Sequence, residues 1–234
     1  AMARAGDNPA LIMAIAQEMV KTQDAEAVVR LFRDKADASQ DGTLPLMTAD
    51  FLIRNDKQLA AVEILEGMRQ RLGADAKNRL HVMRLLANTY QATERYHDAV
   101  SVFEDIIKRH PDDYIAMNNL AFCYTEYLQL PQKAMDHAIK AMALAPDDRG
   151  VKGNIMDTLG WAQFQAGKLD EATVTLRDSI REMPTVHNRY HLARVLIGKG
   201  NTHEAQLQLR MVQAEARKIG DEKMLAEAER LLDF

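Results

Sequence analysis

The sequence is poor in the residues that cross-link or interrupt a chain. It has one cysteine, Cys123, so an intrachain disulfide and a zinc site built from cysteines are both excluded. Only 6 prolines and 11 glycines occur in 234 residues, and this scarcity favours helices over strands. Hydrophobic residues make up 47% of the chain, which is enough to build a buried core.

An excess of positive charge and long apolar runs are also missing. The formal net charge is -4, and no stripe of Lys and Arg supplies the footprint that phosphate groups require, so a nucleic-acid partner is disfavoured. No apolar run approaches the roughly 18 residues that span a bilayer. We therefore expect a soluble chain, cytoplasmic or a soluble extracytoplasmic domain of a larger bacterial protein, with the compartment left open.

A repeating pattern organises the residues that are present. Alanines recur at intervals of 33 to 38 residues, and three prolines keep the same phase, each 12 residues beyond one of these alanines. Within each interval, apolar residues follow helical spacing on two successive segments, which predicts a helix hairpin. The alanines are Ala61, Ala99, Ala134, Ala172 and Ala205, and the prolines are Pro111, Pro146 and Pro184.

This pattern resembles the tetratricopeptide repeat (TPR) of bacterial proteins, a unit of about 34 residues with a Trp-x2-Leu-Gly-x2-Tyr, Ala-x3-Phe and Pro signature. Residues 153–186 carry the resemblance best, through Leu159-Gly160, Gly167, Ala172 and Pro184, although Met156 and Gln163 replace the Trp and Tyr. The subfamily stays open. Short segments such as Asn118-Asn119-Leu120-Ala121 are weakly similar to repeat proteins associated with exopolysaccharide export.

The resemblance implies an all-α, right-handed superhelical solenoid of antiparallel helix hairpins, in one domain over residues 1–234. We expect about four good repeats, two degenerate ones and a C-terminal capping helix, with Asp147–Lys152 as a lengthened loop between two repeats. The expected segments are a degenerate hairpin at 8–36, a degenerate repeat at 42–75, repeats at 80–113, 114–147, 153–186 and 186–219, and the cap at 221–234.

In this family the first helix of each repeat lines a concave groove that receives partner segments. Residues expected to bind there are Arg84, Asn88, Asn119, Phe122, Trp161, Tyr190, His191 and Arg194. Trp161, Tyr190 and Arg194 form the best patch, because aromatic residues beside Arg are enriched in binding hot spots. Partial burial of Trp161 against Phe164 is the competing interpretation.

Two more specific kinds of site, a carboxylate clamp and a metal site, are alternatives to this general groove. Arg84, Asn88 and Asn119 resemble part of the clamp with which some TPR domains hold chaperone C-termini, but Asn154 and Thr158 stand where its last two cations belong. His187 and His191 have helical metal-ligand spacing but no third ligand, so we expect neither a metal nor a cofactor. No nucleophile or phosphate-loop motif occurs, and the chain is not expected to be an enzyme.

The sequence therefore predicts a non-catalytic scaffold that binds a peptide or protein segment in its groove, with a partner that is acidic or carries a free carboxylate. The alternative is a structural protein that self-associates through its degenerate N-terminal repeats.

Overall fold

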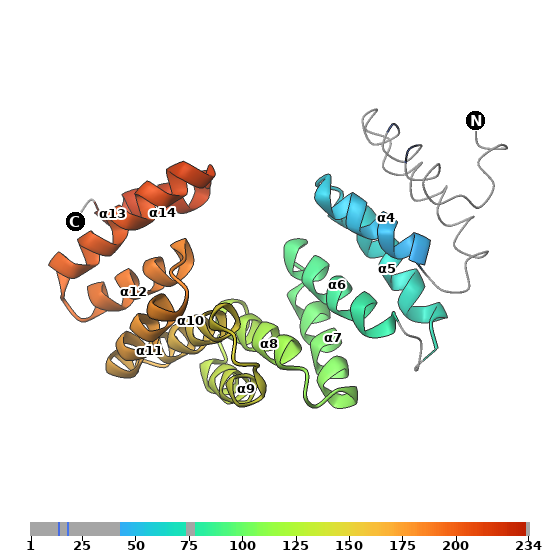
Figure 1. Cartoon of the computed structure of the whole chain (residues 1–234), viewed down its shortest axis with the longest axis horizontal. Helices are drawn as coiled ribbons and strands as arrows, with labels where there is room; N and C mark the ends of the chain where they lie inside the picture. Colours follow the sequence, from blue (N-terminus) through green and yellow to red (C-terminus); the bar gives the residue numbers. More distant parts are fainter. Residues whose placement is uncertain (1–13, 15–17, 19–42, 74–77, 233–234) are drawn as a thin grey trace. The chain divides into compact units, whose positions relative to one another are not determined.

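The computed structural model describes residues 14, 18, 43–73 and 78–232, and in that part of the chain every regular element is an α-helix (Figure 1). The hairpin expected at 8–36 lies almost wholly outside the described residues. Contacts divide the chain into two compact units, residues 1–109 and residues 110–234. Each unit is described by itself.

In the described part of unit 1, four helices form two consecutive hairpins. Helices α4 and α5 pack together, α5 packs on α6, and α6 packs on α7. Their facing sides bury Leu52 and Leu65, then Leu86 and Phe103, all with no exposed surface. The helices are α4 (Thr43–Arg54), α5 (Gln58–Arg71), α6 (Arg79–Ala92) and α7 (Tyr96–Arg109).

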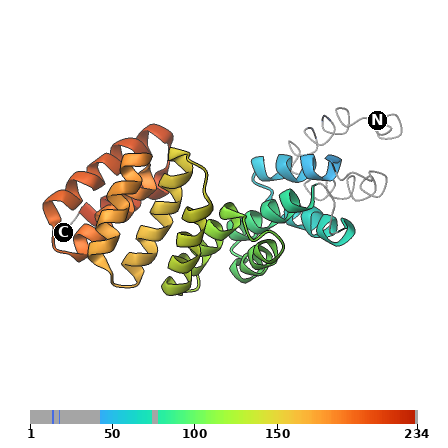
Figure 2. The ribbon, with the colours of Figure 1, turned by 60° about the horizontal axis from the view of Figure 1, so that its bottom comes forward.

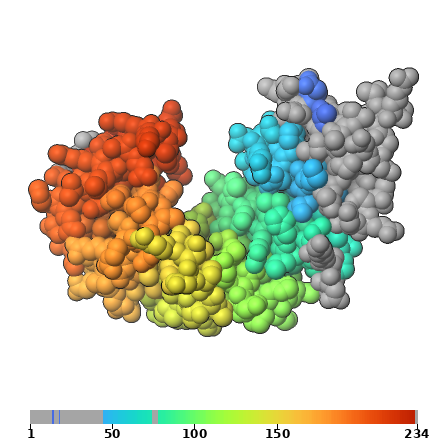
Figure 3. All heavy atoms as spheres, viewed as in Figure 1, coloured from blue at the N-terminus to red at the C-terminus, as the bar shows by residue number. Residues whose placement is uncertain are grey.

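Unit 2 contains three hairpins followed by a closing helix, stacked side by side (Figure 2). The first helices of its hairpins, α8, α10 and α12, contact one another in sequence, while each second helix packs on its own first helix. In the space-filling view the atoms from α8 to α14 form one continuous body (Figure 3). The helices are α8 (Tyr114–Glu126), α9 (Pro131–Leu144), α10 (Arg149–Gln165), α11 (Leu169–Glu182), α12 (Val186–Gly198), α13 (Thr202–Ile219) and α14 (Glu222–Leu232).

The turns inside the described hairpins share two backbone features. One residue in each turn has a positive φ, and these residues are Asp56, Glu94, Gln129, Gly167 and Gly200. The residue after it donates its N–H back to a carbonyl of the first helix, as Arg95 does to Tyr90 at 2.8 Å and Lys168 to Gln163 at 2.9 Å. The α8–α9 turn carries the extra residue expected from its sequence, because Leu130 reaches back six positions, to Tyr124. The shared turn extends to α4–α5, where the side-chain signature is weak.

The prediction of a loop at Asp147–Lys152 is wrong over most of that range, because α10 already begins at Arg149. The Asp148 carboxylate accepts the Val151 N–H at 2.8 Å and caps the helix. Gly153 has a packing role rather than a helix-breaking one. A Cβ there would lie 3.0 Å from the Met183 Cβ, so the glycine lets α10 approach the end of α11.

The end of the hairpin series follows the expected pattern. Gly220 adopts a left-handed conformation with φ of 75° and ends α13, and the Asp221 carboxylate accepts the Met224 N–H at 2.9 Å at the start of α14. Helix α14 then covers the last hairpin, with Ala228 fully buried against Val212 and Ala216 of α13. An apolar face that a further hairpin would otherwise cover is thereby removed from water.

Candidate functional site

Four of the expected binding residues meet on neighbouring first helices of unit 2. Trp161 lies on α10, and Tyr190, His191 and Arg194 lie on α12. We call these four residues, together with Phe164 of α10, the Trp161 cluster. They are held by contacts among themselves and by three carboxylates on α8, α10 and α14.

The centre of the cluster is a stack of three rings. The Trp161 indole lies between Phe164, at a centroid distance of 4.9 Å and an interplanar angle of 21°, and His191, at 4.4 Å and 14°. Only 4% of Trp161 is exposed. The indole ring is therefore held rigidly and is almost fully buried. Burial of Trp161 against Phe164, the competing interpretation of the sequence, is present.

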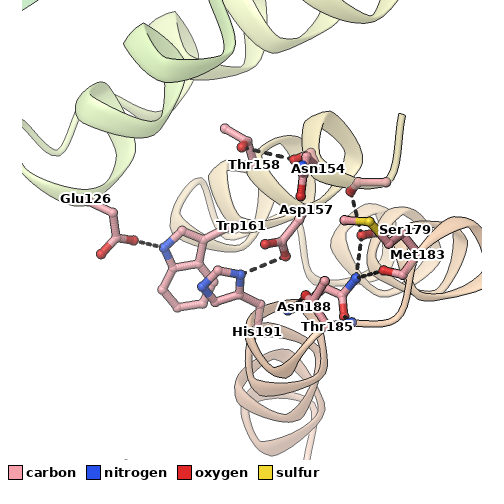
Figure 4. Close-up of polar contacts among 11 residues, drawn as sticks. Glu126, Asn154, Asp157, Thr158, Trp161, Ser179, Met183, Thr185, Asn188 and His191 are labelled. Atoms are coloured by element: carbon pink, nitrogen blue, oxygen red, sulfur yellow. Dashed lines mark hydrogen bonds and ion pairs between the residues drawn. The ribbon is translucent and has the colours of Figure 1, made fainter. Parts of the chain in front are cut away.

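Two carboxylates fix the orientation of this stack (Figure 4). The Trp161 indole N–H donates to Glu126 at the end of α8, and His191 Nδ1 lies 2.8 Å from the Asp157 carboxylate of α10. Each bond joins residues one repeat apart, 35 positions in the first case and 34 in the second. They tie three successive first helices together at one place.

Arg194 lies over the aromatic residues of the cluster. Its guanidinium carbon is 5.2 Å from the Trp161 ring centre, 5.8 Å from that of Tyr190 and 6.0 Å from that of Phe164, distances typical of cation–π contacts. The Arg194 side chain donates to the Tyr190 hydroxyl at 3.3 Å. The aromatic rings therefore hold the cation in one position.

Helix α14 anchors the far side of the cluster. The Tyr190 hydroxyl donates to Glu227 at 3.2 Å, and Arg230 also donates to Glu227, at 2.6 Å. Hydrogen bonds from Arg230 and Tyr190 hold the pKa of Glu227 below its usual range, so this carboxylate is charged near neutral pH. The capping helix thus fixes Tyr190, which in turn orients Arg194.

The remaining expected residues lie elsewhere. Asn119 and Phe122 are half-buried on α8, the first helix next to α10, where the Phe122 ring meets Tyr127 edge-on at 5.9 Å. Arg84 and Asn88 are on α6 in unit 1, with Asn88 exposed and Arg84 half-buried. These two residues belong to the unit that is described separately from the Trp161 cluster.

Sequence reasoning named none of the three carboxylates, Glu126, Asp157 and Glu227, as a site residue. The repeat period was the signal that could have found them, because all three carboxylates bond to residues 34 to 37 positions away. Equivalent positions of adjacent first helices are neighbours in a repeat array.

Of the two histidines with metal-ligand spacing, His191 belongs to the cluster and His187 does not. His187 is exposed on α12, whereas the ring of His191 is occupied by Trp161 and Asp157. Across residues 43–73 and 78–232, no group of three or more His, Cys, Asp or Glu side chains could hold a metal ion. No helix in the described residues is long and apolar enough to cross a membrane.

The stacked hairpins and their repeat-spaced contacts define a helix-hairpin repeat protein. A tetratricopeptide-repeat family model matches residues 82–113. A TPR repeat-containing protein of Pseudomonas aeruginosa is 31% identical over 174 residues, which cover 71% of this chain and 27% of that protein. The chain thus spans about a quarter of this curated relative.

Solved structures agree on the fold. A TPR protein of Thermus thermophilus has a TM-score of 0.66 at 18% identity, covering 81% of this chain and 98% of that one. MamA of Desulfovibrio magneticus has a TM-score of 0.62 at 16% identity, covering 77% and 97%. The chain is a tetratricopeptide-repeat protein of the bacterial type, and the all-α hairpin fold expected from the sequence is confirmed.

Proposed function

We propose that this chain is a non-catalytic scaffold that holds a segment of a partner protein on the first-helix face of unit 2. That face is the surface presented by α8, α10 and α12. Proteins of this family generally mediate protein–protein interaction. The observation that carries the proposal here is the Trp161 cluster, which joins a cation and several rings across two adjacent first helices.

The cluster has the properties of a recognition surface. Its aromatic core is pre-organised, so a partner would not have to order it on binding. Its borders are polar, with exposed Glu126, Asn154 and His187 and half-buried Arg194 available to contact a segment. Aromatic and arginine residues at the centre of a polar rim are typical of binding hot spots.

A matched pair of substitutions tests the proposal. Partners captured with the whole chain are identified by mass spectrometry, and the affinity of a purified partner is measured by calorimetry. Asn154→Arg, on the exposed first-helix face one turn before Asp157, should weaken binding by about tenfold or more by obstructing the segment. Val174→Arg introduces the same group on second helix α11, where Val174 is 61% exposed, and should leave affinity unchanged.

Equal losses in both variants, or a loss only in Val174→Arg, would move the binding surface away from the first helices. Size-exclusion chromatography with light scattering tests the alternative of self-association. A monomer at all concentrations excludes an assembly role. An oligomer that Asn154→Arg leaves intact, with no protein captured, would favour assembly over partner binding.

A further inference from the structure

Two groups of opposite charge at the Trp161 cluster, Arg194 within it and Glu126 at its border, form no salt bridge with a described residue. Among the described residues, neither Glu126 nor Arg194 has a counter-ion within 4.0 Å, although Arg194 helps to lower the pKa of Glu227 from a longer distance. Glu227 forms a salt bridge with Arg230, and Asp157 lies within hydrogen-bond distance of His191. Some other exposed charges of unit 2 form salt bridges, such as Arg177 with Glu204. Both groups contact Trp161.

One indole ring separates these two groups. Glu126 accepts the Trp161 N–H in the plane of the ring, and the Arg194 guanidinium lies over the ring at 5.2 Å from its centre. Because each group is held by the same rigid ring, their separation is fixed by the cluster. Arg194 uses one of its five N–H donors, on Tyr190, and Glu126 keeps acceptor positions beyond the one filled by Trp161.

From this arrangement we infer that the site recognises a mixed-charge segment, in which an acidic side chain binds Arg194 and a basic side chain nearby in sequence binds Glu126. The inference rests on the proposed function and names the chemistry of the partner. A purely acidic segment would meet Glu126, Asp157 and Glu227 beside Arg194, and a purely basic one would meet Arg194. A segment with both signs matches the two unpaired charges.

The spacing of the two charges in the partner is constrained. An extended segment advances about 3.3 Å per residue, and the two protein groups border a single ring, so the acidic and basic residues should be separated by only a few positions. A chain terminus is not needed for this match. Peptides blocked at both ends should therefore bind as well as peptides with a free C-terminus.

The probe is a library of short random peptides, acetylated at the N-terminus and amidated at the C-terminus, selected on the whole chain. Wild-type protein should enrich peptides with Asp or Glu close to Lys or Arg. Selected peptides are then titrated against the protein, with Trp161 emission as the readout, since it is the only tryptophan. Arg194→Gln and Glu126→Gln should each weaken these peptides by about ten- to a hundredfold.

Two further variants separate recognition from structural damage. Arg210→Gln removes an exposed arginine on second helix α13 and should leave affinity unchanged. The charge-swapped double variant Glu126→Arg with Arg194→Glu should select peptides in which the order of the acidic and basic residues is reversed. Loss of folding alone cannot produce that reversal.

Other results overturn the inference in distinguishable ways. Enriched peptides that lack one sign of charge, or that need a free C-terminal carboxylate, would refute mixed-charge recognition while the proposed function stands. Unchanged affinity in Arg194→Gln would do the same. A wild-type chain that enriches no peptide and captures no partner protein would overturn both the inference and the proposed function.

Discussion

At the scale of single residues, Gly160 shows how closely the helices of one repeat approach. A Cβ at this position would lie 2.6 Å from Leu176 Cγ, and Leu176 is fully buried on α11, so the two helices would have to shift apart. Gly160→Ala should therefore lower the free energy of unfolding by about 1–3 kcal/mol. Urea unfolding followed by Trp161 emission measures this loss.

Gly198→Ala is the matched control. The added Cβ would meet Phe164 at 3.5 Å, an ordinary contact, and alanine favours a helix over glycine by about 0.5–1 kcal/mol. This variant should be as stable as wild type or more so. Equal destabilisation of both variants would show that the loss at Gly160 does not come from helix contact.

The hairpin turns allow two substitutions with opposite expected signs. Glu94 has a φ of 60° without being glycine, so Glu94→Gly should relieve backbone strain and stabilise the chain by up to about 1 kcal/mol. Gly167 has a φ of 77° and open space around it, so Gly167→Ala should destabilise by about 1 kcal/mol through strain alone. Thermal unfolding by circular dichroism checks both signs. A stabilising Gly167→Ala would contradict the shared turn geometry.

The residues that sequence reasoning predicted well are those fixed by the repeat. Ala99, Ala134, Ala172 and Ala205 have no exposed surface, as their period indicated, because every hairpin needs a small residue at the same crossing. The loop prediction at Asp147–Lys152 was wrong, since a glycine at a helix contact, such as Gly153, and a glycine in a loop look alike in sequence. The carboxylates around Trp161 were missed because the repeat period brings their positions close to the rings but does not fix the rotamers that form the bonds.

At the scale of elements, one buried asparagine joins the three helices α10, α11 and α12 at their ends. The Asn188 side chain donates to Ser179 Oγ at 3.0 Å and to the Met183 carbonyl at 2.8 Å. Ser179 in turn donates to the Gly153 carbonyl of α10 at 2.8 Å. Asn188 also completes the capping box of α12 with Thr185 (Figure 4). Its amide thus supports both a helix start and the junction between two repeats.

Asn188→Ala should cost about 2–3 kcal/mol of unfolding free energy, because α12 would lose its capping box and the Ser179 hydroxyl and Met183 carbonyl at the end of α11 would lose their donor. The comparison is Asn201→Ala, which removes an exposed cap from α13 whose bond to the Glu204 N–H is 3.4 Å long. That change should cost about 0.5–1 kcal/mol. Urea unfolding of the two variants decides the point. Similar losses would mean that the junction adds nothing beyond an ordinary helix cap.

At the scale of the whole molecule, the hairpins of unit 2 depend on their neighbours. Each hairpin buries its core partly against the next, so the last one needs a cover. Helix α14 supplies this cover, and the same helix carries Glu227, which holds Tyr190 beside Arg194. Stability at the end of the array and the geometry of the proposed binding site therefore rest on one element.

Two arginine substitutions on α14 test this coupling. Ala228 is fully buried against α13, so Ala228→Arg would place a long charged side chain in the last core cluster and displace the helix. Overpacking alone costs about 1–3 kcal/mol, and the unpaired buried charge adds to it. Ala226→Arg adds the same group at an exposed position of the same helix and should leave stability within about 0.5 kcal/mol of wild type. Urea unfolding followed by Trp161 emission gives the stability difference, and binding of a hydrophobic dye reports the uncovered core.

Because Tyr190 would lose Glu227, Ala228→Arg should also weaken the binding of peptides that depend on Arg194, at temperatures where the protein is still folded. Retained peptide affinity in a destabilised Ala228→Arg variant would show that α14 covers the array without positioning the site.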